Sequence, residues 1–358
     1  MSSHVRNSPH HTASSAAAGL PGMVWIPPGT FLMGCEQFYP EERPLREAHV
    51  EGVWFDRHPV TVREFRGFIA ATGYETVAER PLDTERYPGA DPELLVPGSL
   101  VFQKPARRVR LSDVRAWWAY VPGASWQHPE GPGSSVSERR RHPVVHVAYE
   151  DAAAYAEWAG KSLPTEAEWE HAARGGLDGK LFTWGDDPLP GGRLMANTWQ
   201  GEFPWQNLKA NGYEGTSPVG AFPPNGYGLY DMAGNVWEWT ADRFATPARS
   251  LDTEARCDGE TRCHDGQGQV RDRHCDDEEH AAEAVPASCC APPSHAAAIQ
   301  QAEETEETAS PDSIPTRVIK GGSHLCAPNY CLRYRPAARE AEAIDTSTSH
   351  IGFRCVKR

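Results

Sequence analysis

Two cysteines near the C-terminal end, Cys326 and Cys331, could converge on one metal ion. They lie five residues apart, and Pro328 and Asn329 between them favour a turn. Positive neighbours favour the thiolate, the form of cysteine that binds metals, and two thiolates suit a soft ion such as Cu(I). On spacing alone, a small structural disulfide or two inert buried thiols is the more common outcome, because C-x4-C is not a standard zinc spacing. The basic residues that crowd this segment are Lys320, Arg333, Arg335 and Arg339.

The elements that must position this turn are short strands. Residues 317–322 and 351–356 have the composition of strands, and they bracket the two cysteines in the sequence. Residues 23–34 predict a strand, a Pro-Gly turn and a second strand. Further apolar pieces, such as 226–230 and 236–239, stand between Gly, Pro and Asn residues. The turn that carries the two cysteines is therefore predicted to be connected to strands of small sheets.

Helices are predicted from capping residues and apolar spacing. Residues 62–72 carry apolar residues at helical spacing, with Thr61 as the N-cap and Gly73 as the stop. A second helix is predicted over 149–159. A third helix begins at Thr165, which forms a capping-box pattern with Glu168. This helix ends near Gly175. We expect one α+β domain with little regular structure and two long helices on one side of small twisted sheets.

The composition of the 358-residue chain is that of a globular protein rich in turns. Hydrophobic residues make up 39%, and there are 32 Gly and 31 Pro. No run of eighteen apolar residues exists, so no membrane span is predicted. The polar, His-rich residues 1–22 are expected to form a disordered tail and not a signal peptide, which predicts a cytoplasmic protein. Nine cysteines in a reducing compartment favour metal binding or catalysis over a disulfide framework.

The negative charge is concentrated in one segment. Net charge is −14, which argues against nucleic acid as a partner, and residues 245–315 hold 16 acidic residues against five Arg. That segment has no Phe, Tyr or Trp, so we predict a mobile acidic insert that interrupts a domain of residues 23–358. A metal site in the insert is the alternative, although the spacings match no zinc module. Its candidate ligands are Cys257, Cys263, His264, His274, Cys275, Cys289 and Cys290.

The segment from Lys320 to Arg339 resembles the catalytic segment of formylglycine-generating enzymes. It reads KGGSxxCxxxYCxRYRxAAR and is followed by the closing Gly352-Phe353-Arg354-Cys355. Upstream motifs resemble the same family in the same order, although a wider superfamily shares them. The two cysteines in the last motif narrow the resemblance from that superfamily to the formylglycine-generating enzymes. These motifs begin at Trp25 (WxPxGxFxMG), Trp126 (WxHPEGP), His142 (HPVVH), Trp158 (WAGKxLPTEAEWE) and Asn225 (NGYGLYDMAGNVWEW).

The resemblance implies a fold related to C-type lectin domains and a copper-dependent oxidase. In that family, Cu(I) lies between the two cysteines, here Cys326 and Cys331, and the client thiol joins as a third ligand. O2 and a thiol reductant then convert a cysteine in a Cys-x-Pro-x-Arg motif of an unfolded or nascent sulfatase into formylglycine. By the same resemblance, Ser323, Tyr330 and Trp237 line the pocket for oxygen and the client thiol. We expect a monomer.

The resemblance also implies two structural calcium sites. The first would use Asn197, the Thr198 carbonyl, Asn211 and the Tyr213 carbonyl. Oxygen ligands from side chains and backbone in a Gly-rich loop suit Ca²⁺, whereas an ordinary turn Asn or Asp is the alternative for each residue. The second site would use Asp231, Glu238 and the carbonyls of Gly234 and Val236.

The chain departs from secreted relatives in its cysteines. By the resemblance, the positions that pair in those relatives hold Ala156 and Ala173, opposite Cys355 and Pro336. Cys355 is therefore predicted to be an unpaired thiol. This departure fits a cytoplasmic, prokaryote-like member of the family.

Two other functions stay open at this point. A non-catalytic lectin-like binding module would not need two cysteines in this register. An iron-dependent sulfoxide synthase needs a facial set of histidines. The candidates in the matching region, His142, His146, His324 and His350, do not form a helical ligand face.

Overall fold

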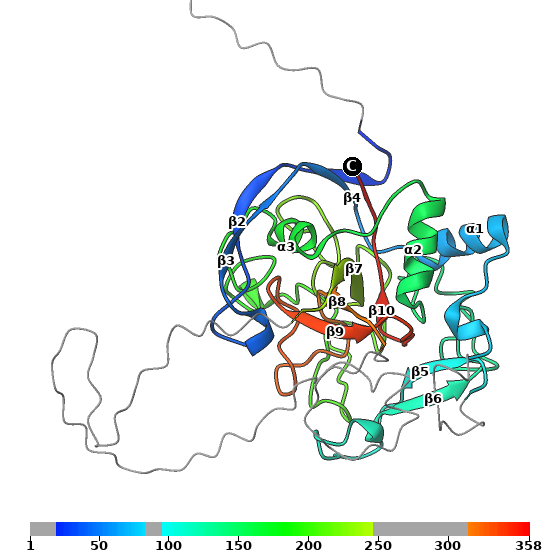
Figure 1. Ribbon diagram of the computed structural model, residues 1–358. Helices are drawn as coiled ribbons and strands as arrows, with labels where there is room; N and C mark the ends of the chain where they lie inside the picture. Colours follow the sequence, from blue (N-terminus) through cyan, green and yellow to red (C-terminus); the bar gives the residue numbers. More distant parts are fainter. Residues whose placement is uncertain (1–18, 83–94, 246–313) are drawn as a thin grey trace, which may run out of the picture.

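The computed structural model describes residues 19–82, 95–245 and 314–358 (Figure 1). The helices are α1 (Val62–Thr72), α2 (Tyr149–Trp158) and α3 (Glu166–Arg174). No strand in the described part of the chain is longer than seven residues. The strands are β1 (Met23–Ile26), β2 (Gly29–Met33), β3 (Arg46–Val50), β4 (Val53–Asp56), β5 (Gly98–Phe102), β6 (Trp118–Pro122), β7 (Trp237–Arg243), β8 (Thr316–Lys320), β9 (Arg339–Ala343), β10 (Ile351–Gly352) and β11 (Val356–Lys357).

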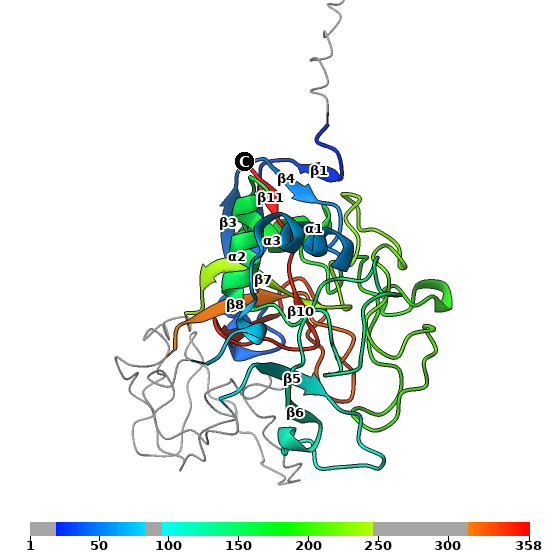
Figure 2. The ribbon, with the colours of Figure 1, turned by 90° about the vertical axis from the view of Figure 1, so that its right-hand side faces the viewer.

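Four small sheets are formed by the described residues. The largest has the order β10-β7-β8-β9, in which β10 runs parallel to β7 and the other pairs are antiparallel. A three-stranded sheet has the order β1-β4-β11, and β2-β3 and β5-β6 form two-stranded ribbons. Figures 1 and 2 show the three-stranded sheet at one end of the molecule and the β5-β6 ribbon at the other, with the four-stranded sheet between them. The predicted C-terminal strand of residues 351–356 is thus two short strands that belong to different sheets.

Local capping sets the helix boundaries that the sequence predicted. Thr61 accepts the backbone N–H of Glu64 while the Glu64 carboxylate accepts the N–H of Thr61, and Gly73 ends α1 in the left-handed conformation. Thr165 and Glu168 form the same box at α3. These predictions are confirmed.

The position of the helices differs from the prediction. Instead of two long helices on one side, there are three helices of 9 to 11 residues among the described residues. The α3 helix contacts β2 and β3 as well as β7 and β8, so it lies between the β2-β3 ribbon and the four-stranded sheet (Figure 1). Its buried residues include Glu166, Glu170 and Arg174 as well as Trp169. A helix with this many buried charges must be matched by charges on the sheet.

The main hydrophobic cluster joins the helices to the four-stranded sheet. Phe65 of α1, Tyr155 of α2 and Trp237 of β7 belong to it, together with Cys326 and Cys331. Completely burying one large apolar side chain contributes about 1.5–3 kcal/mol. The two cysteines are therefore part of the main hydrophobic cluster.

The acidic segment enters and leaves at neighbouring strands. β7 pairs with β8 through Arg243 and Arg317, and the N–H of Phe244 donates to the carbonyl of Thr316 (3.1 Å). An insertion between two paired strands costs little closure entropy beyond that of a shorter loop. The predicted insert of residues 245–315, with its Cys and His residues, lies outside the described residues except at its ends, and so does most of the predicted tail 1–22.

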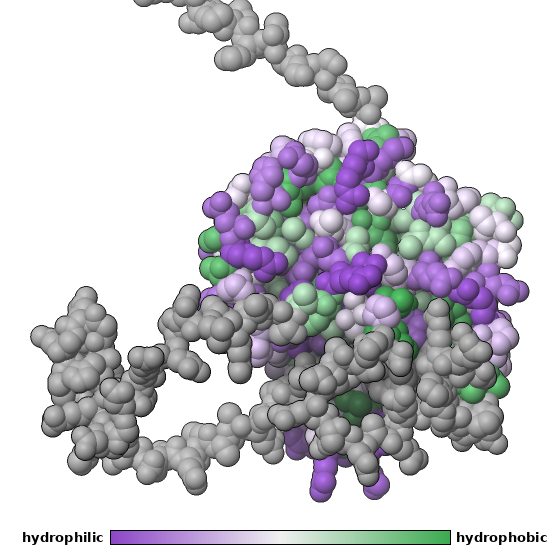
Figure 3. All heavy atoms as spheres, viewed as in Figure 1, coloured by the Kyte–Doolittle hydropathy of each residue, from purple (hydrophilic) through white to green (hydrophobic). Residues whose placement is uncertain are grey.

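The surface of the described part is mixed in character. Among the described residues, no helix is both long and apolar enough to cross a membrane. On the face in Figure 3, hydrophilic and hydrophobic side chains are interspersed over the described elements.

Candidate active site

The segment that follows β8 depends on two glycines. Gly321 and Gly322 have φ values of 94° and 67°, in the left-handed region that favours glycine. A Cβ on Gly322 would lie 2.9 Å from the carbonyl oxygen of Arg333 and from the nitrogen of Tyr334. The chain before the cysteines therefore lies directly against the chain after them.

Between these segments, a compact turn carries the cysteines. The N–H of Cys326 donates to the carbonyl of Ser323 (3.0 Å), and the N–H of Cys331 donates to the carbonyl of Ala327 (2.8 Å). The N–H of Ser323 donates to Sγ of Cys326 at 3.4 Å. Both cysteines are buried, with exposed fractions of 0% and 1%. The structure thus places Ser323 against Cys326 and both cysteines in one turn, and the convergence of the two sulfurs on one metal ion stays a prediction.

The two cysteines differ in oxidation state. Cys326 is a thiol, whereas Cys331 is disulfide-bonded. Cys35 and Cys355 are also thiols. A structural disulfide between Cys326 and Cys331 is thereby excluded, and the prediction that Cys355 is an unpaired thiol is confirmed.

Aromatic rings form the wall beside the turn. The Tyr330 ring stacks on Phe203 with centroids 4.4 Å apart and meets Trp117 edge-on at 5.8 Å. Trp237 is completely buried and shares the main cluster with both cysteines, and Tyr330 packs against that cluster. Four of the five predicted catalytic residues thus lie in or against one apolar cluster, and the fifth, Ser323, contacts Cys326.

The basic residues around the turn are each paired with carboxylates. Lys320 is completely buried, with Nζ 3.0 Å from Glu170 and 3.8 Å from Glu166. Burial raises the pKa of the Glu170 carboxyl, but Lys320 and Arg174 outweigh that effect and hold the pKa below its usual value. The other three basic residues are also paired with buried or half-buried glutamates: Arg333 with Glu41 and Glu340, Arg335 with Glu42, and Arg339 with Glu166. These carboxylates offset the charges of the four cations, and their predicted effect on the thiolates stays a prediction.

Three buried histidines, His146, His324 and His350, lie close enough together for two of them to affect the pKa of the third. Burial lowers the pKa of His324 to about 4 and of His146 to about 3. Burial also lowers the pKa of His350 well below its usual value, and the other two histidines add to that effect. Within the described ranges, however, no group of three or more His, Cys, Asp or Glu residues is arranged to hold a metal ion. His142 lies elsewhere, with Nδ1 2.9 Å from Oγ1 of Thr216.

Asn235 was not predicted from the sequence as a site residue. It connects the cysteine turn to the loops that carry Asn197 and Ser217. Its carbonyl accepts both the main-chain N–H (3.0 Å) and Nδ1 (2.9 Å) of His324. Its side-chain oxygen accepts the N–H of Ser217 (2.9 Å) and lies 3.3 Å from Nδ2 of Asn197. Asn235 is completely buried with a φ of 60°, and an Asn after a Gly is the one sequence signal for such a residue.

The first predicted calcium set is partly assembled. Nδ2 of Asn211 lies 2.8 Å from Oδ1 of Asn197 and 3.2 Å from the carbonyl oxygen of Thr198, and its Oδ1 accepts the N–H of Tyr213. The amide of Asn211 therefore occupies the point where the two oxygens converge. A cation there needs this amide to turn so that its oxygen points inward.

In the second predicted calcium set, Arg354 already occupies the Glu238 carboxylate. Both carboxylate oxygens of Glu238 are bonded by Arg354, at 2.7 Å each, and one also accepts from Trp169 (2.8 Å). The Asp231 carboxylate instead accepts the N–H of Gly220 (2.8 Å) and lies 3.3 Å from Nδ2 of Asn235. Arg354 supplies the positive charge that calcium would have supplied. The other predicted ligands, Gly234 and Val236, lie in the same segment, and we find no fit to calcium there.

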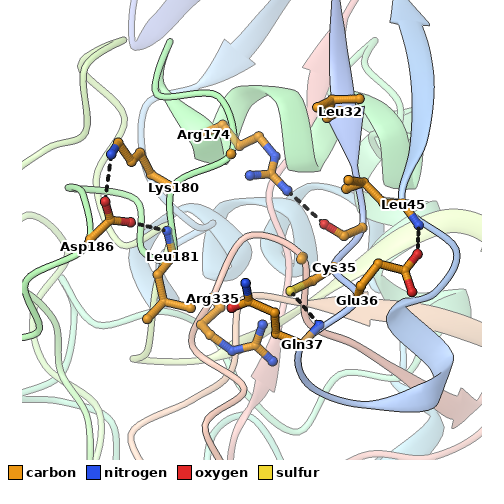
Figure 4. A pocket seen from close by; sticks show the side chains of 13 residues that line it. Leu32, Cys35, Glu36, Gln37, Leu45, Arg174, Lys180, Leu181, Asp186 and Arg335 are labelled. Carbon is orange, nitrogen blue, oxygen red and sulfur yellow. Dashed lines mark hydrogen bonds and ion pairs between the residues drawn. The ribbon is translucent and has the colours of Figure 1, made fainter. Parts of the chain in front are cut away.

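Two cavities flank this region and differ in character. A cavity of about 600 Å³ is lined by Pro328, Asn329 and Leu332 of the turn segment and by aromatic residues such as Trp184. A second cavity, of about 370 Å³, is lined by charged residues that include Arg174, Lys180 and Asp186 (Figure 4). There Arg174 donates to a backbone carbonyl, Lys180 pairs with Asp186 (2.6 Å), and Sγ of Cys35 accepts the N–H of Gln37 (3.4 Å).

The donor set of the turn fits a soft metal ion once both sulfurs are thiols. The two sulfurs are buried in one apolar cluster, and a backbone N–H already donates to that of Cys326. A two-sulfur site without carboxylates suits Cu(I) better than a hard cation. The disulfide of Cys331 must be reduced before this residue can be a ligand.

Comparisons with known proteins give one consistent result. A family model described as the sulfatase-modifying factor enzyme 1-like domain matches residues 9–358. The formylglycine-generating enzyme of Mycobacterium tuberculosis is 49% identical over 334 residues, which cover 93% of this chain and 97% of that protein. The enzyme of the same name from Mus musculus is 38% identical over 99% of this chain and 79% of its own length. The resemblance found in the sequence is therefore confirmed.

Two further similarities set limits on what likeness alone can establish. A mouse protein named inactive C-alpha-formylglycine-generating enzyme 2 is 43% identical over 236 residues, which cover 64% of this chain and 72% of that protein. The solved structure of PvdO from Pseudomonas aeruginosa has a TM-score of 0.52 at 23% identity, and the match covers 95% of this chain and 99% of that one. The second similarity supports the fold, and the first shows that a relative of comparable identity is named inactive.

Proposed function

Because this chain belongs to the formylglycine-generating enzymes, we propose that it oxidises one cysteine of a client sulfatase to Cα-formylglycine, using copper and O2. The proposed client is an unfolded or nascent sulfatase that carries a Cys-x-Pro-x-Arg motif. The observation that carries the proposal is the buried turn in which Cys326 and Cys331 share one apolar cluster. Since a relative of comparable identity is named inactive, this pair supports catalysis more directly than overall similarity does.

The reaction balances with a thiol reductant. The client side chain, R–CH2–SH, loses two hydrogens to become a thioaldehyde, while two thiols are oxidised to a disulfide. The four hydrogens reduce O2 to two waters. One water then replaces the thioaldehyde sulfur, which leaves as H2S, and the product is R–CHO.

Cys326 and Cys331 would hold the copper ion. When bound, copper would supply the one-electron chemistry that lets O2 react with the client. Reduction of the Cys331 disulfide comes first in this scheme, because only thiolates can hold the ion. The same thiols that reduce O2 are able to perform this activation.

The surrounding residues would keep the reaction dry and oriented. Trp237 and the stacked pair of Tyr330 and Phe203 exclude water from the sulfurs. Ser323 is completely buried beside Cys326 and provides a hydroxyl group in an otherwise apolar wall. A hydroxyl in such a wall can orient one polar atom of the client or of oxygen by hydrogen bonding.

The test is turnover of a synthetic peptide that contains Cys-x-Pro-x-Arg. The protein, pre-reduced with a thiol, is incubated with Cu(I) and O2, and the peptide is analysed by mass spectrometry for the aldehyde. A peptide with Ser in place of Cys is the matched control. No aldehyde after reduction and copper loading would contradict the proposal, and copper near one equivalent per chain would support it against a metal-free or iron-containing relative.

Calcium is proposed only for the set formed by Asn197, Thr198, Asn211 and Tyr213. Two oxygens already converge there, and a turned Asn211 amide would add a third. We also propose that the protein is a cytoplasmic monomer; neither property enters the mechanism.

A further inference from the structure

Ser323 is held by hydrogen bonds from both its main chain and its hydroxyl group. Its N–H donates to Sγ of Cys326 (3.4 Å), and its carbonyl accepts the N–H of Cys326 (3.0 Å). Its hydroxyl oxygen accepts the N–H of Leu325 (3.2 Å) and lies 3.1 Å from Nδ1 of His350. Of these bonds, the one with His350 reaches a distant part of the chain, so it ties the cysteine turn to the sheet.

His350 is itself firmly placed. It directly precedes β10, and its carbonyl accepts the N–H of Trp237 (2.9 Å) from β7. Its N–H donates to Oγ1 of Thr348 (3.3 Å), and its ring meets that of Trp118 edge-on with centroids 4.9 Å apart. The side chain is completely buried. Its Nδ1 is therefore a fixed point against which the Ser323 hydroxyl can be oriented.

The hydrogen-bond network indicates which ring nitrogen carries the proton. Burial lowers the pKa of His350 well below its usual value, so the ring is neutral and carries one N–H. Nε2 is buried and has no hydrogen-bond partner among the described residues. A buried N–H without an acceptor is rarer in proteins than an unsatisfied acceptor, so the proton belongs on Nδ1. His350 then donates to Ser323.

This assignment decides what the Ser323 hydroxyl can do. Its oxygen receives two N–H groups, from Leu325 and from His350, which fill its two lone pairs. The hydroxyl proton must then be donated, and in the described part of the chain no acceptor for it is found. The proton is left for a group that the protein does not supply, next to Cys326.

We propose that His350 is a positioning residue that sets the polarity of the Ser323 hydroxyl, so that Ser323 donates a hydrogen bond to the group that reacts at Cys326. This inference rests on the proposed function for its kinetic consequence. The structural consequence, that His350 holds the turn around Cys326, is independent of the proposed function.

The kinetic test compares two substitutions of similar size. His350→Asn keeps an N–H donor near the position of Nδ1, whereas His350→Leu has none. We expect His350→Leu to lower kcat for the client peptide by about tenfold or more, with KM changed less than about twofold. His350→Asn should restore kcat to within about threefold of the original. A loss that appears in KM alone, or equal losses in both variants, would overturn the proposal.

A double-mutant cycle tests whether His350 acts through Ser323. In a Ser323→Ala background, His350→Leu should lower kcat no further, because the hydroxyl that it orients is gone. If His350→Leu costs the same factor in both backgrounds, His350 acts by another route and the proposal fails.

A third measurement does not need activity. In the reduced, metal-free protein, the rate of alkylation of Cys326 by iodoacetamide is followed by peptide mass spectrometry. His350→Leu should raise this rate by about fivefold because the turn loses its tie to the sheet, and His350→Asn should not. Equal rates in the two variants would refute the proposal even if the protein made no formylglycine, whereas absent turnover with unequal rates would refute only the proposed function. If His350→Leu does not fold, His350→Gln replaces it, since its amide reaches towards Nε2 instead of Nδ1.

Discussion

The segment from Lys320 to Arg339 has two sides that differ in how they treat charge. On one side, Lys320 and its three arginine neighbours bond to glutamates of α3, β9 and residues 41–42. On the other side, Cys326 and Cys331 lie among Trp237 and other apolar residues. Residues a few positions apart in the sequence therefore face environments of opposite polarity.

This difference shows that charges close in sequence to the cysteines are paired with carboxylates from distant parts of the chain. A buried cation is stable only when a carboxylate meets it, so the glutamates determine where Lys320 and the arginines point. The sulfurs are left in an apolar region, which suits a soft metal ion and excludes water.

The largest effect is expected on the sulfur side. Cys326→Ser and Cys331→Ser should each lower turnover of the client peptide by on the order of 10⁴-fold or more, because two sulfurs that act as one site fail together. The double variant should be scarcely worse than either single one. Turnover and copper stoichiometry are measured on each purified protein.

The matched control for the cysteines is Cys355→Ala. Cys355 is an equally buried thiol in the same cluster but lies outside the turn. Turnover should remain near normal, and near-normal turnover in either Cys326→Ser or Cys331→Ser would show that the two sulfurs do not form the site.

The next largest effect is expected on the charged side. Lys320→Met should lower the free energy of unfolding by about 3–5 kcal/mol, because it leaves the buried Glu170 without one of its two cations. Urea denaturation measures this loss. The control, Lys180→Met, removes an exposed ion pair with Asp186 and should cost less than about 1 kcal/mol. If Lys320→Met is instead stable but slows alkylation of Cys326, the cation serves the sulfur and the two sides are not separate.

A smaller effect is expected in the pH dependence of stability, which should differ in sign between the carboxyl groups of Glu342 and Glu170. Burial and then Glu340 raise the pKa of Glu342 to about 8, and no ion-pair partner for Glu342 is found in the described ranges. Since the folded pKa is higher than the usual 4.5, this group stabilises the fold at low pH and loses that contribution as pH rises towards 8. Glu342→Gln should therefore be more stable than the original chain at pH 8.5, by roughly 2 kcal/mol, and not at pH 4.5.

Glu170 has the opposite sign, since its pKa is lowered. It stabilises the fold above the usual pKa of a glutamate and loses that contribution on acidification. Urea titrations at pH 4.5, 7 and 8.5 measure the pH dependence of both groups. Identical pH dependence in the original chain and Glu342→Gln would contradict the assignment.

The smallest effect concerns calcium. Calcium at ten times its dissociation constant should stabilise the chain by about 1.4 kcal/mol through the Asn197–Asn211 set. Asn211→Asp should strengthen this response and Asn211→Leu should remove it. Asp231→Asn, in the set where Arg354 already pairs with Glu238, should leave the response unchanged. Thermal unfolding with calcium and with chelator is the measurement; a response lost only in Asp231→Asn would reverse the assignment.

The sequence by itself determined the local features of this protein. The boundaries of α1 and α3 follow from Thr61 and Thr165, whose partners lie three residues away. The cysteine turn follows from Pro328 and Asn329, and the approach to it from Gly321 and Gly322. Such interactions join residues that are neighbours in the chain, so they are present in the residue pattern before any tertiary contact forms. The family resemblance then supplied the role of the cysteines.

Only the tertiary structure decided which charged and polar groups meet. Glu238 pairs with Arg354, although it had been predicted to bind calcium with Asp231. His350 meets Ser323, and no spacing in the sequence pointed to that contact. These partners come from strands and loops that are distant in the chain, and the energy of a buried charge depends on what stands opposite it. For this reason, the residue pattern located the cysteines, while the fold alone determined the charges and hydrogen bonds around them.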